Sequence, residues 1–203
     1  MKPRWSRRLG VLLLIGAVVP PACKGPAPVR TGERAQVVDA GPKRDPELDR
    51  RVSVYAAVIR RLVEIDHTYG GADPGFRVVY VIDGAVPGAE DPNKDVGDLA
   101  PSERFDADLK DGLKKRLEDL PPLRFVADRD LVIRYQSSSD PLGRVINDGA
   151  LITLGPIRSH EKRLEVGHNL WISGLAGLWQ TYVLSRDNKV WGVSGTTGPS
   201  ALS

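Results

Sequence analysis

Cysteine and histidine are scarce in this sequence of 203 residues, which has one cysteine, Cys23, and three histidines. A single cysteine excludes an intrachain disulfide, so the fold must be held together by packing alone. Scattered histidines without a further thiol do not give the ligand spacing of a zinc site. We therefore expect no disulfide, no bound metal and no cofactor.

Sequence motifs of two large enzyme classes are missing as well. The chain has no Gly-x-Ser-x-Gly sequence, which presents the nucleophile in many hydrolases. Its glycine-rich segment 192–198 lacks the Gly-Lys-Ser/Thr sequence of a phosphate-binding loop. Residues 91–97 place oxygen ligands at alternate positions, but Val96 stands where a calcium loop requires glycine. These absences favour binding over nucleophilic catalysis.

Long apolar runs are limited to residues 9–19, which are too few for a membrane span of about 20 residues. Basic residues precede this run, and small or turn-forming residues lead from it to Cys23. This order is typical of a secretory signal peptide. We predict that residues 1–22 are removed and that no membrane-spanning helix remains.

Cys23, directly after this signal, resembles the acylated cysteine of bacterial lipoproteins. Ala22 matches the small residue that precedes that cysteine, whereas Pro20 and Pro21 depart from the usual pattern. The resemblance implies a lipid such as palmitate at Cys23 and an extracytoplasmic, membrane-anchored protein. The alternative is ordinary secretion or a periplasmic location.

Basic residues are concentrated in the segment that we expect to be removed. Residues 1–22 carry four positive charges and no negative one. The whole chain has a formal charge of +3, and without those four charges it is −1. Nucleic-acid binding needs a clustered positive surface, so we expect no nucleic-acid partner.

Residues 23–44 are rich in glycine, proline and charge and show no apolar period, which predicts a flexible tether. Residues 45–203 then form a single domain. Its first helix is expected to begin at Asp45-Pro46, because aspartate caps helices and proline suits the first position. A second is expected between Pro101 and Pro121, and Gly112 inside it costs about 1 kcal/mol relative to alanine. Apolar residues recur at helical spacing in both segments, at Leu48, Val52, Tyr55, Ile59 and Leu62 and at Phe105, Leu109, Leu113 and Leu117.

The remaining apolar segments have the composition of strands. Residues 77–83 predict an interior strand, residues 163–172 alternate strictly, and 178–184 with 190–193 predict a hairpin. Helices followed by strands predict the α+β class, with two amphipathic helices on a curved antiparallel sheet that ends in a C-terminal β-meander. The order is similar to NTF2-like and cystatin-like folds, which implies no function.

Three residues are candidates for catalysis. His67 follows Asp66 at the predicted end of the first helix, and a carboxylate such as Asp66 or Asp83 would orient it as a general base. The structural alternative is that His67 caps the helix, where the dipole favours a cation. His168 lies on the apolar face of its strand, which predicts a buried, hydrogen-bonded neutral histidine.

Aromatic residues gather in the predicted meander, at Trp171, Trp179, Tyr182 and Trp191. On a half-buried sheet such side chains usually pack in the core or against neighbouring strands. The functional alternative is a stacking surface that binds a sugar or a peptidoglycan fragment.

Several segments are distinctive as they stand, namely VYAAVIRRLV, DHTYGGADPGF, VYVIDGAVPGAEDP, GALITLGPI, WQTYVL and WGVSGTTGP followed by ALS. Across residues 52–203 they resemble a family of bacterial secreted or lipid-anchored proteins without an assigned activity, so no catalytic residue transfers. We expect a lipid-anchored binding protein whose partner is an envelope polymer or another exported protein. The alternative is a small hydrolase or isomerase-like enzyme that uses His67 and a carboxylate in a pocket between helix and sheet. A purely structural tether is a third class.

Overall fold

The computed structural model describes residues 45–68, 74–94, 100–135, 143–160 and 163–203. The predicted signal peptide, the predicted tether and Cys23 lie outside the described residues. Among the helices that are described, none combines the length and apolar character needed to cross a membrane.

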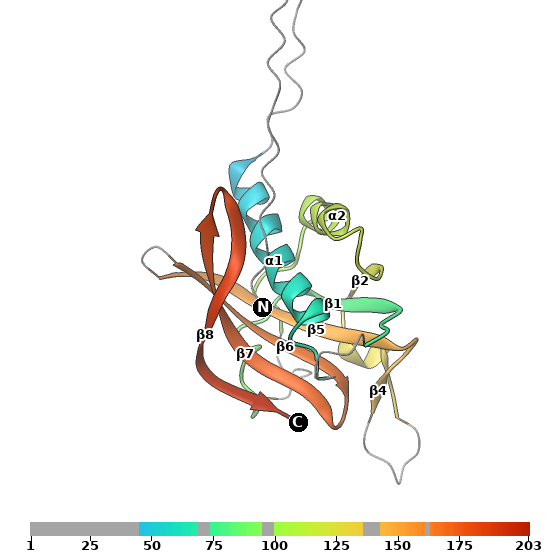
Figure 1. The fold of residues 1–203 in the computed structure, drawn as a ribbon. Helices are drawn as coiled ribbons and strands as arrows, with labels where there is room; N and C mark the ends of the chain where they lie inside the picture. The colour runs from blue at the N-terminus through green and yellow to red at the C-terminus, as the bar shows by residue number, and fades with distance from the viewer. Residues whose placement is uncertain (1–44, 69–73, 95–99, 136–142, 161–162) are drawn as a thin grey trace, which may run out of the picture. The chain divides into compact units, whose positions relative to one another are not determined.

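Helix α1 spans Pro46–Glu64 and begins where the sequence predicts (Figure 1). The carboxylate of Asp45 accepts a hydrogen bond from the backbone N–H of Glu47 at 2.9 Å, and Pro46 occupies the first turn. One face of the helix is buried, through Val52, Val54, Tyr55, Ala56, Val58, Ile59, Leu62 and Val63. The predicted apolar stripe is therefore the face that packs on the sheet.

The described strands form one sheet of eight. They are β1 Val78–Ala85, β2 Leu123–Val126, β3 Ile133–Arg134, β4 Arg144–Val145, β5 Gly149–His160, β6 Arg163–Ser173, β7 Ala176–Asp187 and β8 Val190–Leu202. The order across the sheet is β2-β1-β5-β6-β4-β3, and β7 pairs with β6 on one side and with β8 on the other. The α+β class and the C-terminal meander β5–β8 are confirmed.

The sheet is antiparallel in its C-terminal part, as expected, and differs from the expected antiparallel sheet only in the pairing of β1. Strand β1 pairs in parallel with both β2 and β5, while β5 to β8 pair antiparallel in succession. Helix α2 (Ala107–Arg116) lies between β1 and β2 in the chain. A crossover through a helix returns the chain in the same direction, which allows parallel neighbours.

Helix α2 spans Ala107–Arg116 and begins later than Pro101 suggests. The carboxylate of Asp106 accepts a hydrogen bond from the backbone N–H of Leu109 at 2.7 Å and caps this helix. Before the cap, Ser102 donates its backbone N–H to the carbonyl of Ala85 at 2.8 Å. Pairing with the end of β1 therefore holds this segment extended and delays the helix.

Gly112 allows the two helices to approach closely. A Cβ at Gly112 would lie 2.7 Å from Cγ2 of Val52 in α1. Distances that short force a neighbour to shift, so alanine here would trade better helix propensity for crowding between α1 and α2. The cost in helix propensity is offset by packing that the helical pattern does not reveal.

Two apolar clusters cover the two faces of the sheet. The larger joins α1 and α2 to one face and includes Leu164, Val166, Leu170 and Ile172 of β6. His168, the remaining residue of the predicted alternation, is buried as well. The smaller lies on the other face and includes Val86 and Ala89 from the segment after β1, together with Leu151 of β5. The chain after β1 therefore covers the face that the helices leave open.

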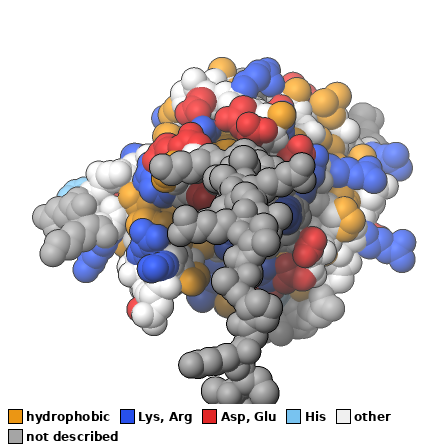
Figure 2. All heavy atoms as spheres, turned by 90° about the horizontal axis from the view of Figure 1, so that it is seen from above, with side chains coloured by type: hydrophobic (Ala, Val, Ile, Leu, Met, Phe, Trp, Pro, Cys, Tyr) orange, Lys and Arg blue, Asp and Glu red, His pale blue; other side chains and the backbone are white. Residues whose placement is uncertain are grey.

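Charged residues of α1 tie it to its surroundings. Arg60 donates two hydrogen bonds of 2.7 Å to the carboxylate of Asp119, and Arg51 binds Glu103 at 2.8 Å. Figure 2 shows acidic and basic side chains interspersed on the face seen from above. The basic residues of this helix thus serve local ion pairs.

Candidate functional site

Two rows of side chains cross the meander on the face opposite the helices. In one row Asn169 of β6 pairs with Thr153 of β5 and with Trp179 of β7. In the next row Trp171 pairs with Leu151 and with Gly177. Since successive side chains of a strand alternate between faces, these residues point away from His168 and Leu170.

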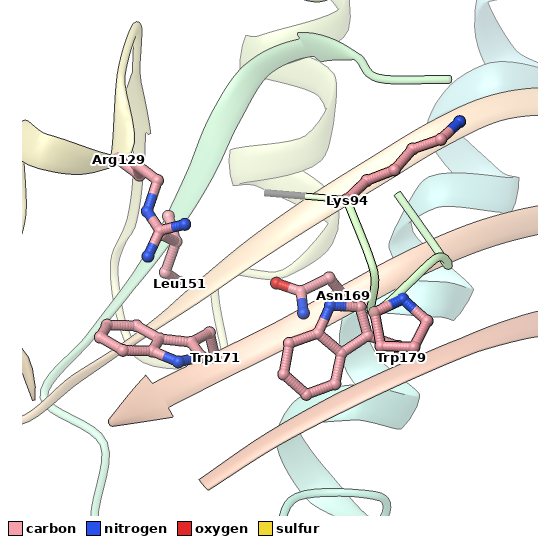
Figure 3. Close-up of a pocket in the computed structure, with 7 residues that line it drawn as sticks. Lys94, Arg129, Leu151, Asn169, Trp171 and Trp179 are labelled. Atoms are coloured by element: carbon pink, nitrogen blue, oxygen red, sulfur yellow. The ribbon is translucent and has the colours of Figure 1, made fainter. Parts of the chain in front are cut away.

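A pocket of about 300 Å³ opens over these rows (Figure 3). Its lining comes from the segment after β1, from the 3-10 helix η2 (Arg129–Leu131) and from β5, β6 and β7. The lining residues are Pro92, Lys94, Arg129, Leu151, Asn169, Trp171 and Trp179. Segments that are distant in sequence thus meet at one small concave site.

Gly177 provides the space that Trp179 occupies. A Cβ at Gly177 would lie 2.5 Å from Cη2 of the Trp179 indole. The indole therefore lies along β7 toward the position opposite Trp171. Because Gly177 has no side chain, the Trp179 indole can approach Trp171, and both tryptophans line the same side of the pocket.

Arg129 supplies positive charge above this wall. Its guanidinium carbon lies 5.5 Å from the centre of the Trp171 ring, within the range of a cation–π contact. Asp128 holds the short helix in place by accepting a hydrogen bond from the backbone N–H of Asp130 at 2.9 Å. Lys94 lines the pocket differently, because its ammonium lies beside Gly88 and points away from Asn169.

Buried polar atoms without partners mark this face of the sheet. Asn169 is only 2% exposed, and neither its Nδ2 nor the Nε1 of Trp179 has a hydrogen-bond partner among the described residues. Thr153 Oγ1, in the same row, also has none there. Leaving such a group unpaired costs about 1–3 kcal/mol, so a ligand that paired with them would recover that free energy.

Glu90 fixes the rim of the pocket over the meander. A Cβ at Gly167 would collide with Oε2 of Glu90, so this carboxylate lies directly over the β6 backbone. Arg158 of β5 binds the other oxygen of Glu90 at 2.8 Å. The backbone N–H of Val86 also donates to the carbonyl of Leu154 at 2.8 Å. The segment that carries Pro92 and Lys94 is therefore anchored to β5 and β6.

The candidate catalytic residues do not line this pocket. His67 is buried and lies beyond Ile65, the C-cap of α1. Asp66 binds Arg61 at 2.7 Å and accepts a hydrogen bond from the Tyr182 hydroxyl at 2.6 Å. Asp83 binds Lys110 at 3.2 Å through Oδ2, while its buried Oδ1 has no partner among the described residues. Each carboxylate is therefore engaged with a cation of its own.

The electrostatics of Asp66 are unfavourable for a general base. Burial acts to raise the pKa of Asp66, but hydrogen bonds from Arg61 and Tyr182 outweigh burial and hold this pKa below its ordinary value. Burial and the neighbouring Asp66 raise the pKa of Tyr182. A general base at neutral pH needs a pKa near 7, and the interactions of Asp66 lower its pKa further from that value.

His168 is buried as predicted, but the described residues do not provide the hydrogen bonds that were expected for it. Its ring is fully buried and lies 4.0 Å from the Tyr182 ring, centre to centre. Neither ring nitrogen has a hydrogen-bond partner among the described residues. Burial lowers the pKa of His168 to about 3. The imidazole therefore acts as an aromatic core residue.

The four meander aromatics divide between the two faces. Trp171 and Trp179 line the pocket, whereas Tyr182 is fully buried beneath the helices and Trp191 packs against the same cluster. Trp179 and Tyr182 are three residues apart on β7, and because successive side chains of a strand alternate between faces, this spacing places them on opposite faces of the sheet. The sequence did not identify Arg129 and Asn169 as pocket residues, because no local sequence pattern indicates which distant segment packs against them.

Comparison of the chain with family models, with curated proteins and with solved structures gave no match.

Proposed function

We propose that this protein is an extracytoplasmic, lipid-anchored binding protein whose ligand occupies the pocket between Trp171 and Trp179. The observation that carries the proposal is a pair of buried donors beside two indole walls, Asn169 Nδ2 and Trp179 Nε1, for which the described residues provide no partner. A small concave site with aromatic walls and a few convergent polar groups is typical of ligand binding. An envelope polymer is the expected source of the ligand.

The enzyme alternative has less support from the geometry. A hydrolase or isomerase that used His67 with Asp66 or Asp83 would need a carboxylate available to orient the imidazole. Asp66 and Asp83 instead bind Arg61 and Lys110. Within the described part of the chain, the residues that line the pocket include no carboxylate, histidine, serine or cysteine.

Binding of soluble peptidoglycan fragments tests this function. We expect saturable binding to the detergent-purified protein, and Trp179→Leu should weaken it at least tenfold by removing an indole wall and its donor. Gly177→Ala should weaken it in the same direction, since its Cβ displaces the indole. Isothermal titration calorimetry measures both effects.

Trp191→Leu is the matched control, because Trp191 packs on the opposite face and should leave the affinity within twofold. Equal affinity of the Trp179→Leu and wild-type proteins, or no binding of any fragment, would argue against the pocket as the site.

Lipid attachment is tested separately at Cys23. Cells that express the protein and are fed a fatty-acid analogue should label the wild type, and the Cys23→Ser variant should lose the label, because the thiol is the proposed acyl acceptor. The fractionation of the variant should shift from membrane to soluble material. A label that persists on Cys23→Ser would contradict the anchor while leaving the pocket proposal intact.

A further inference from the structure

We infer that the pocket recognises the acetamido arm of an N-acetylated amino sugar, an inference that rests on the proposed binding function. The carbonyl oxygen of that arm would accept hydrogen bonds from Asn169 Nδ2 and from Trp179 Nε1 together. The pairing of β6 with β7, the burial of the two donors and the size of the pocket each support this class of ligand.

Asn169 and Trp179 bring two hydrogen-bond donors to one place at the floor of the pocket. The two residues are direct partners across β6 and β7, a position at which Cβ atoms are about 4.5–5.5 Å apart. The Cη2 end of the Trp179 indole lies over Gly177, and Figure 3 shows the indole nitrogen on the side toward the amide of Asn169. The two N–H groups are therefore neighbours.

Neither of these donors can satisfy the other. Indole and amide nitrogens only donate, and the described residues offer no acceptor to either one. A carbonyl oxygen has two lone pairs, so one such oxygen can accept from both donors. A hydroxyl in the same place would add a hydrogen of its own between two donors. The pair therefore selects a carbonyl oxygen over a sugar hydroxyl.

Burial of the donors favours an arm that projects from the ligand. Asn169 is only 2% exposed, so the accepting oxygen must extend beyond the part of the ligand that rests on the indoles. An acetamido group is flat and holds its carbonyl oxygen away from the sugar ring. Its methyl group can contact the apolar surface that Leu151 and Pro92 contribute to the lining.

The walls and the volume fit one sugar ring that carries such an arm. Trp171 and Trp179 offer flat apolar surface to the C–H face of a pyranose. A volume of about 300 Å³ is at the lower end of small-molecule sites and suits a single ring with its substituent. A peptide carries the same amide group, but its extended backbone needs a longer groove.

N-acetylglucosamine and glucose test the arm, because they differ only in an acetamido group and a hydroxyl at one carbon. We expect N-acetylglucosamine to bind the detergent-purified protein about tenfold more tightly in titration calorimetry, from two added hydrogen bonds. In proton–nitrogen correlation spectra the indole N–H signal of Trp179 should move downfield with N-acetylglucosamine and not with glucose. Its loss in Trp179→Leu assigns that signal.

Asn169→Asp tests the amide donor at the floor. The substitution replaces Nδ2 by an oxygen of similar size, which cannot donate to the carbonyl, so the preference for N-acetylglucosamine over glucose should fall about tenfold. Asn188→Asp makes the same exchange at an exposed position between β7 and β8, and the preference should stay within about twofold of the wild type. Circular dichroism confirms that both variants are folded.

The outcomes separate this inference from the proposed function. If peptidoglycan fragments bind and Trp179→Leu weakens them, but N-acetylglucosamine binds no more tightly than glucose, the acetamido class is wrong and the binding function stands. An unchanged preference in Asn169→Asp, or an indole signal that does not move, overturns the assignment of the two donors. Tighter binding of N-acetylalanine methylamide than of N-acetylglucosamine would favour a peptide and overturn the sugar. If neither the fragments nor any sugar binds, both proposals fail.

Discussion

Replacing His168 with leucine is expected to remove most of the loss of stability between pH 6.5 and pH 4. Burial lowers the pKa of His168 from 6.5 to about 3 in the folded protein. Between these two values the unfolded chain binds a proton that the folded protein does not, so the free energy of unfolding falls as the pH falls. Over the whole window the loss amounts to about 5 kcal/mol, from 1.36 kcal/mol per pKa unit.

At neutral pH the same substitution should change stability by only about 1 kcal/mol. Leucine is close in size to histidine, and neither His168 ring nitrogen has a hydrogen-bond partner among the described residues to lose. Urea unfolding followed by circular dichroism at pH 7, 5.5 and 4.5 measures the effect. A His168→Leu protein with the same pH slope as the wild type would contradict the assignment.

The charged neighbour of His168 acts in a different pH range. Hydrogen bonds from Arg61 and Tyr182 outweigh burial and hold the pKa of Asp66 below 3.8. The stability that Asp66 contributes is therefore present above pH 3.8 and is lost as the pH falls through its folded value. Any change that His168→Leu makes above pH 4 in the dependence of unfolding free energy on pH is therefore due to His168 and not to Asp66. His160→Gln, at an exposed position, is the matched control and should leave the slope as in the wild type.

Truncating Tyr182 to alanine should cost about 3–5 kcal/mol of unfolding free energy, the range for removing a large buried aromatic side chain. Tyr182 is fully buried, and its ring contacts His168 while its hydroxyl binds Asp66 at 2.6 Å. Tyr182→Phe keeps the ring and loses only that hydrogen bond, so it should cost about 1–3 kcal/mol. Chemical denaturation at pH 7 measures both variants.

The difference between the two variants separates ring packing from the hydroxyl contact. Tyr135→Ala, at a position 54% exposed, should change stability by no more than about 0.5 kcal/mol and controls for loss of an aromatic side chain. Equal losses for Tyr182→Phe and Tyr182→Ala would mean that the hydroxyl, and not the ring, supports the core. No loss in either would contradict the burial of Tyr182.

Local patterns in the sequence were sufficient for several features of the fold. Asp45-Pro46 predicts the start of α1, because capping depends on atoms within one turn. Alternation from Leu164 to Ile172 predicts which side of β6 is buried, because successive strand residues point to opposite faces. The helix order and the C-terminal meander follow from the same short-range signals.

Long-range contacts decided the rest. The parallel pairing of β1 depends on where the α2 crossover returns the chain, which no local pattern encodes. Delayed capping at Asp106 reflects the pairing of Ser102 with Ala85. Gly112 is required because Val52, which is distant in the sequence, packs against it and leaves no room for a Cβ.

The candidate site shows the same division. Aromatic residues in the meander were visible in the sequence, and their spacing along β7 assigns Trp179 and Tyr182 to opposite faces. That Trp179 and Trp171 share a pocket with Arg129 was decided by tertiary structure, because the strand register and the packing of η2 bring these residues together. Amino-acid spacing determines which face of a strand a side chain occupies, and only packing between distant segments determines what that face meets.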